Sequence, residues 1–154
     1  MDATNPRLAG ALVATVLLAA ACATQPVATG TAAAPMTVDE ILASAPAPEH
    51  DPGSANCLHR EAYTDIEVIN SELLLFHGRS DRLWLNRLGQ SCTGLRMDHT
   101  LALDMRHGRL CHLDTVSGVD MLGGHYLPGA RCSLGKFDPV SPEQADLLKA
   151  ELSR

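Results

Sequence analysis

The sequence contains few aromatic residues: its 154 residues include two Phe, two Tyr and one Trp. Because aromatic side chains bury the most apolar area and small domains bury a smaller fraction of their surface than large ones, this composition predicts a thin hydrophobic core. A basic patch is also missing. Between residues 55 and 137, nine acidic side chains balance nine basic ones. This balance argues against nucleic acid as a partner.

The motifs of several enzyme classes are absent. The chain has no Cys-x-x-Cys, no Gly-x-Ser-x-Gly and no glycine-rich phosphate loop followed by lysine. Its cysteines also lack the close spacing of a structural zinc site. A hydrolase could be imagined around Asp98 and His99, but a triad requires a geometry that sequence does not define. We therefore predict a protein that is not an enzyme and has no cofactor.

No apolar run is long enough to span a bilayer. The longest, residues 8–21, has 14 residues, whereas a spanning helix needs about 20. It follows Arg7 and ends in small residues directly before Cys22, as in bacterial lipoprotein signals. Residues 1–21 are therefore predicted to be an export signal and Cys22 the site of lipid attachment. Ala19 stands where such signals usually have leucine, so an ordinary signal peptidase cutting after Ala21 is the alternative.

The cysteine count supports this interpretation. Five cysteines would be an odd number for an exported protein, but a lipid on Cys22 leaves four. An even set in an oxidising compartment predicts two disulfides. Of the three possible pairings, we favour Cys57 with Cys132, which joins the first and last segments, and Cys92 with Cys111.

Residues 22–55 are rich in alanine, threonine, proline and glycine. This composition cannot bury a core and predicts a flexible linker. One exception is Thr37-x-x-Glu40, a capping box that could start one or two helical turns.

Residues 56–140 alternate between turn residues and short apolar runs with a period of two, which predicts a small β domain. His107 and Gly108 would join two of its strands in a hairpin, and residues 123–129 would form a loop. Ser141, Pro142 and Gln144 predict the start of a helix over residues 141–154. The fold class is thus mainly β, a disulfide-stapled antiparallel meander or barrel-like domain with one C-terminal helix. Strands are predicted at residues 65–69, 72–76, 82–88, 100–105, 110–114, 116–122 and 131–137.

The single tryptophan marks a candidate binding surface. Trp84 lies between Leu83 and Leu85. If both leucines face the core, the alternation of a strand turns Trp84 outward, beside Arg82 and Arg87. Packing of Trp84 in the core is the alternative.

Methionine and histidine occur in two pairs at spacing two, Met97 with His99 and Met105 with His107. In an extended chain the members of each pair share a face, and thioether with imidazole suits reduced copper. A periplasmic copper-binding protein is therefore the alternative function. The simpler interpretation places Met105 in the core and the others in loops.

Short groups of residues around the four cysteines follow one another in a fixed order: Cys57-Leu58, residues 84–88, 92–95 and 109–111, and Cys132 to Gly135. Together they resemble the exported proteins grouped as domain of unknown function 6491. The resemblance implies a small, cysteine-stapled, mostly β domain behind a lipoprotein or secretory signal, and it implies no activity. Ala23 after Cys22, by resemblance to other lipoproteins, favours the periplasmic face of the outer membrane; a periplasmic or secreted protein is the alternative. We therefore expect an envelope-anchored lipoprotein with a non-enzymatic binding or structural domain, an unknown ligand and an unknown envelope partner.

Overall fold

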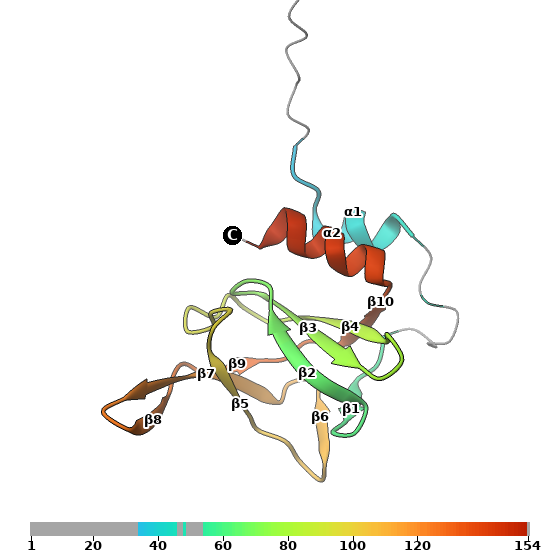
Figure 1. Ribbon diagram of the computed structural model, residues 1–154. Helices are drawn as coiled ribbons and strands as arrows, with labels where there is room; N and C mark the ends of the chain where they lie inside the picture. The colour runs from blue at the N-terminus through green and yellow to red at the C-terminus, as the bar shows by residue number, and fades with distance from the viewer. Residues whose placement is uncertain (1–33, 46–47, 49–53, 154) are drawn as a thin grey trace, which may run out of the picture. The chain divides into compact units, whose positions relative to one another are not determined.

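A computed structural model describes residues 34–45, 48 and 54–153 (Figure 1). The predicted signal segment and Cys22 lie outside these residues. Within them, no helix is long and apolar enough to cross a membrane. The compact unit is Ala34–Arg154.

The centre of the unit is a four-stranded antiparallel sheet in the order β10-β4-β3-β2. β2 (Tyr63–Val68), β3 (Leu73–Gly78) and β4 (Leu83–Arg87) form the meander that the sequence predicts, and β10 (Phe137–Val140) pairs with β4. The β3–β4 turn places Ser80 and Asp81 at φ 58°. Two consecutive left-handed residues match the twist of a tight hairpin.

The remaining strands are shorter. β7 (Thr115–Leu122) pairs with β5 (Thr100–Leu103) on one side and with β8 (His125–Pro128) and β9 (Cys132–Ser133) on the other. β1 (Cys57–His59) pairs with β6 (Arg109–Cys111).

This pairing corrects three predictions. The expected hairpin around His107 is reduced to an isolated bridge between Arg106 and Arg109, because β5 and β6 pair with different strands. The predicted loop at 123–129 contains β8. The predicted strand at 131–137 is divided into β9 and the start of β10, because Gly135 crosses against the backbone of Arg87, where a Cβ atom would collide with the carbonyl oxygen.

The central sheet is buried on both faces (Figure 1). Leu74 and Phe76 point into one cluster, which lies between this sheet and the shorter strands, while Leu73 and Leu75 point into another. In the first cluster the Phe76 ring makes edge contacts with Tyr63 at 5.3 Å and with Phe137 at 5.1 Å, measured between ring centroids. Burial on both faces explains the unbroken apolar run of β3.

Two helices cover the second cluster. α2 (Pro142–Leu152) has Ser141 as its N-cap with a complete capping box, which confirms the predicted C-terminal helix. α1 (Val38–Ala43) also has a complete capping box, formed by Thr37 and Glu40. Ile41 of α1 is fully buried against α2 and the sheet. α1 confirms the helical turns predicted from the capping box of Thr37 and Glu40, and its packing in the compact unit removes Val38–Ala43 from the predicted flexible linker over 22–55.

Candidate functional site

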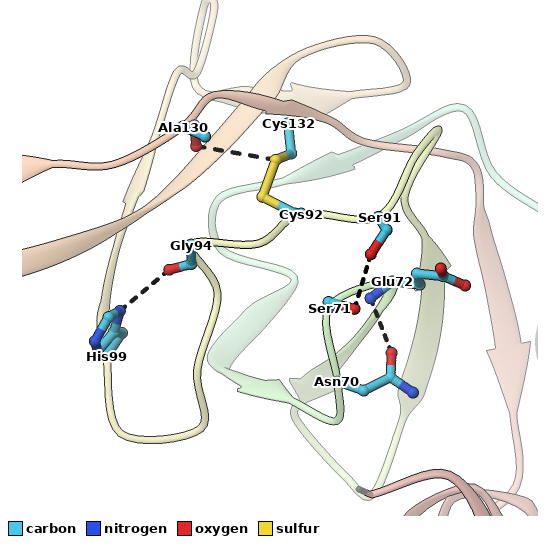
Figure 2. Close-up of a disulfide and its surroundings, with 9 residues drawn as sticks. All are labelled: Asn70, Ser71, Glu72, Ser91, Cys92, Gly94, His99, Ala130 and Cys132. Carbon is cyan, nitrogen blue, oxygen red and sulfur yellow. Dashed lines mark hydrogen bonds between the residues drawn. A yellow bond between two sulfur atoms is a disulfide. The ribbon is translucent and has the colours of Figure 1, made fainter.

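The two disulfides lie on the side of the central sheet away from the helices. Cys57 and Cys111 face each other directly in the β1–β6 register, and Cys92, in the loop after β4, is bonded to Cys132 of β9 (Figure 2). The prediction that all four form disulfides is confirmed. The favoured pairing of Cys57 with Cys132 and Cys92 with Cys111 is wrong, because β6 pairs with β1 and so brings Cys111 to Cys57.

The loop of residues 92–99 is tied to its surroundings at several points (Figure 2). The amide of Cys92 donates to the carbonyl of Ser71 at 2.7 Å, and the hydroxyls of Ser71 and Ser91 lie 3.0 Å apart. At its far end, Nδ1 of His99 lies 3.2 Å from the carbonyl oxygen of Gly94. A fixed loop of this kind can hold a polar side chain in one orientation.

His99 is that side chain, and only 7% of it is exposed. Gly118 of β7 packs against it so closely that a Cβ atom there would collide with the Gly94 carbonyl and with Nδ1 of His99. Nε2 lies 3.2 Å from a carboxylate oxygen of Asp120, at an angle that does not make a hydrogen bond, and Arg96 approaches the same carboxylate at 3.4 Å. Packing thus explains the burial of the ring.

A hollow of about 280 Å³ opens beside His99 and is lined also by Arg60 and Tyr63. The Arg60 guanidinium lies 5.1 Å from the centroid of the Tyr63 ring. Burial raises the pKa of the Tyr63 phenol, and the nearby positive charge partly offsets this effect. The phenol O–H donates to the sulfur of Met105 at 3.4 Å. Polar and apolar groups line this hollow together, as in a small binding site.

The candidate surface around Trp84 does not form. Trp84 is 4% exposed and packs in the cluster between the sheets, while its neighbour Leu85 is buried in the cluster under the helices. The alternation holds, but both faces of β4 are covered, so neither side chain reaches solvent. Arg82 lies 5.6 Å from the Trp84 ring centroid, and Arg87 pairs with Asp39 of α1 at 2.7 Å.

The four residues of the copper alternative have separate surroundings. Met97 is 61% exposed, with its sulfur 3.8 Å from the Ser153 hydroxyl. Met105 contacts Tyr63, His99 packs against Gly118, and His107 occupies the β5–β6 turn at φ 54°. Among the described residues, no three or more His, Cys, Asp or Glu side chains are grouped to hold a metal. These contacts do not favour a copper site.

The most exposed apolar feature is the β7–β8 hairpin, which the sequence patterns did not predict. Residues 121–130 are all exposed, and Met121, Leu122 and Tyr126 are each more than 60% exposed. Gly123 and Gly124 form its turn at φ 59° and 82°. Gly-Gly between two short apolar runs is a hairpin signal that could have located it.

Comparison with known proteins identifies a family without an assigned activity. The model of a family of unknown function, DUF6491, matches residues 5–154. The chain belongs to this family. No curated protein and no solved structure matches the chain.

Proposed function

We propose that this member of the DUF6491 family is an exported lipoprotein, anchored to an envelope membrane through Cys22, whose compact unit is a non-enzymatic binding module. One observation carries the proposal. The two disulfides account for four of the five cysteines, and the fifth, Cys22, directly follows the apolar segment 8–21. One cysteine thus has a role that differs from that of the other four.

The disulfides support export, because such bonds form and persist in oxidising compartments. Two bonds in one small unit are typical of secreted domains with thin cores. Ala23 after Cys22 favours the periplasmic face of the outer membrane as the destination.

The tether in this proposal is short. Residues 23–33, eleven residues, separate Cys22 from the compact unit. Fully extended, they would reach about 40 Å at roughly 3.6 Å per residue. Docking of α1 therefore keeps the unit close to the membrane while allowing it to rotate.

A binding role is favoured over catalysis by the surroundings of the polar side chains. His99, Asp120 and Arg96 come nearest to a catalytic group among the described residues, but the ring is enclosed by Gly94 and Gly118. The hollow beside Tyr63 and the exposed hairpin offer surfaces for a ligand instead.

Intact mass of the protein extracted from membranes under non-reducing conditions tests the proposal. We expect a chain that begins at Cys22, carries the mass of a diacylglycerol and an acyl chain, and has lost the hydrogens of two disulfides. Cys22→Ala is the matched control and should carry no lipid. A chain cut at the same bond but without lipid would show plain secretion and contradict the anchor.

A further inference from the structure

We propose that the β7–β8 hairpin is a membrane-docking element that inserts its tip into the interfacial region of a lipid bilayer. The tip is the run of residues 121–130, which lies between Asp120 and Arg131 and contains no Asp, Glu, Lys or Arg. All ten residues are exposed, and Figure 1 shows the hairpin extending beyond the rest of the short strands. Exposed apolar patches mark sites of interaction with proteins or membranes.

The distribution of side chains over the two faces of the hairpin favours lipid. Met121 pairs with Tyr126, so these two share one face. Leu122 and Leu127 belong to the opposite face, where Leu122 pairs with His125 and Leu127 pairs with Asp120 at the base of the hairpin. Met121, Leu122 and Tyr126 are 66%, 69% and 67% exposed, and Leu127 is 48% exposed. A flat protein surface would cover one face only, whereas lipid surrounds the tip and covers both.

Charges are arranged at the base of the hairpin and not at its tip. Asp120 pairs with Arg96 at 3.4 Å, and Arg131 lies 3.7 Å from Asp104. A tip without Asp, Glu, Lys or Arg above a charged base, with a tyrosine among aliphatic side chains, suits the boundary between acyl chains and headgroups. Because the tip contains no Lys or Arg, its binding should depend little on anionic lipid.

The short tether makes a weak insertion effective, and this step rests on the proposed function. Eleven residues between Cys22 and Ala34 would hold the hairpin at a high effective concentration near the bilayer. The three acyl chains of the proposed anchor would hold the protein at the membrane by themselves but would leave the compact unit free to turn on its tether. The hairpin would supply an additional contact and fix the orientation of the unit.

Sedimentation with neutral vesicles tests the proposal on the compact unit Ala34–Arg154, which contains both buried clusters and both disulfides. We expect the oxidised unit to bind vesicles of equal parts phosphatidylcholine and phosphatidylethanolamine, with little change when salt is raised. Leu122→Ser combined with Tyr126→Ser should weaken binding by about tenfold or more. Leu113→Ser is the matched control, because Leu113 is equally exposed, at 68%, in a turn outside the hairpin. Its binding should equal that of the parent unit.

Fluorescence provides a second measurement. Trp84 is 4% exposed, so its emission should not respond to vesicles. Tyr126→Trp should add emission that shifts to the blue with vesicles and is quenched by brominated lipid. Near-ultraviolet circular dichroism and intact disulfides would establish that each variant is folded.

Three results would overturn the proposal: no binding by the folded parent unit, equal loss in Leu113→Ser, or a dimer that the double variant dissociates, which would identify a second copy as the occupant. The unit in this assay lacks Cys22. Absence of lipid on Cys22 would therefore overturn the proposed anchor without affecting the vesicle result, and failure of vesicle binding would leave the anchor intact.

Discussion

The two faces of the central sheet are buried by different means. On one face, α1 and α2 cover a cluster that is aliphatic and, within the described residues, contains no cysteine. On the other face, strands of two to eight residues cover a cluster that contains four of the five aromatic side chains and one disulfide, with the second disulfide beside it. The aliphatic cluster consists of Ile41, Ile69, Leu73, Leu75, Leu85, Val140, Ala145 and Leu148.

This difference shows how a chain with few aromatic residues completes its core. Helices bring a continuous apolar stripe and form their own backbone hydrogen bonds, so they need no cross-link to stay in place. Strands of two or three residues, such as β9 and β1, have few ladder bonds. Cross-links at Cys57–Cys111 and Cys92–Cys132 hold these short strands, and they leave the outer side of β7 and β8 free as an exposed surface.

Phe76→Ala, on the strand-covered face, should lower the free energy of unfolding more than the other substitutions below. Phe76 is fully buried and joins Tyr63 to Phe137, so truncation should lower the free energy of unfolding by about 3–5 kcal/mol. Urea unfolding with both disulfides intact measures the change. Leu147→Ala, at a position 37% exposed on α2, is the control and should stay within about 0.5 kcal/mol of the parent. A loss for Phe76→Ala as small as that of the control would contradict the role of the aromatic cluster.

Removal of a disulfide should have the next largest effect. The two bonds span sequence separations of 54 and 40 residues, so replacing either pair by alanine should cost a similar amount, about 2–4 kcal/mol. Their rates of reduction should differ. Cys57 and Cys111 are half-buried, whereas Cys92 and Cys132 are 1% and 2% exposed.

Dithiothreitol under native conditions, followed by alkylation and peptide mass mapping, should therefore label Cys57 and Cys111 first. The Cys92–Cys132 bond should react after local opening of the cluster. Equal rates of labelling would show that burial in this cluster does not protect its disulfide.

Local sequence patterns predicted the elements whose partners are near in the chain. The meander of β2, β3 and β4 and the helix after Ser141 are confirmed, because turns and caps are set by neighbouring residues. Cys111 shows the limit. Its strand pairs with β1, far earlier in the sequence, and the residues around it fit a hairpin with β5 equally well. The predicted disulfide pairing was wrong because it depended on that hairpin.

The predictions for Trp84 and for the β7–β8 hairpin were wrong for different reasons. Alternation correctly separates Trp84 from Leu85, but it does not tell whether the second face of a sheet is covered. The four consecutive apolar residues of β3 indicated cover on both faces. In the hairpin, the cluster of turn residues at 123–129 predicts a loop, although Gly123 and Gly124 form a two-residue turn between two strands.

Gln144→Ala tests whether hydrogen bonds from α2 hold α1 against the helix-covered face of the sheet. Gln144 is 2% exposed, and its Nε2 donates to the carbonyls of Ile41, Leu42 and Ala45 at 3.4, 3.0 and 3.2 Å. Without this donor, the carbonyl groups at the end of α1 would be buried with no hydrogen-bond partner. The free energy of unfolding should therefore fall by about 1–3 kcal/mol.

Ser141→Ala is the matched control for this substitution. It removes the α2 cap, at a cost of about 1 kcal/mol, and leaves the donor to α1 in place. Hydrogen exchange should show that Gln144→Ala deprotects α1 together with the first turn of α2, because the Gln144 side chain also accepts from the Ser141 amide, while Ser141→Ala deprotects the first turn of α2 alone. Deprotection of α1 in both variants would contradict a specific role for the Gln144 amide.

The smallest expected effect is the response of α1 to acid. Hydrogen bonds from the backbone and hydroxyl of Thr37 lower the pKa of the Glu40 carboxyl. A lowered folded-state pKa means that the stabilisation is present above the unfolded glutamate pKa of about 4.3 and is lost as pH falls through the folded value. The protection of the α1 amides against hydrogen exchange, relative to the intrinsic exchange rate at each pH, should therefore fall below about pH 4 in the parent. In Glu40→Gln this acid-dependent step should be absent.

Because Ile41 anchors α1 by burial, which does not titrate, the helix should loosen at its first turn and stay docked. An acid response that persists unchanged in Glu40→Gln would assign it to another carboxyl, such as Glu143 at the start of α2, whose pKa is also lowered by its hydrogen bond with Ser141.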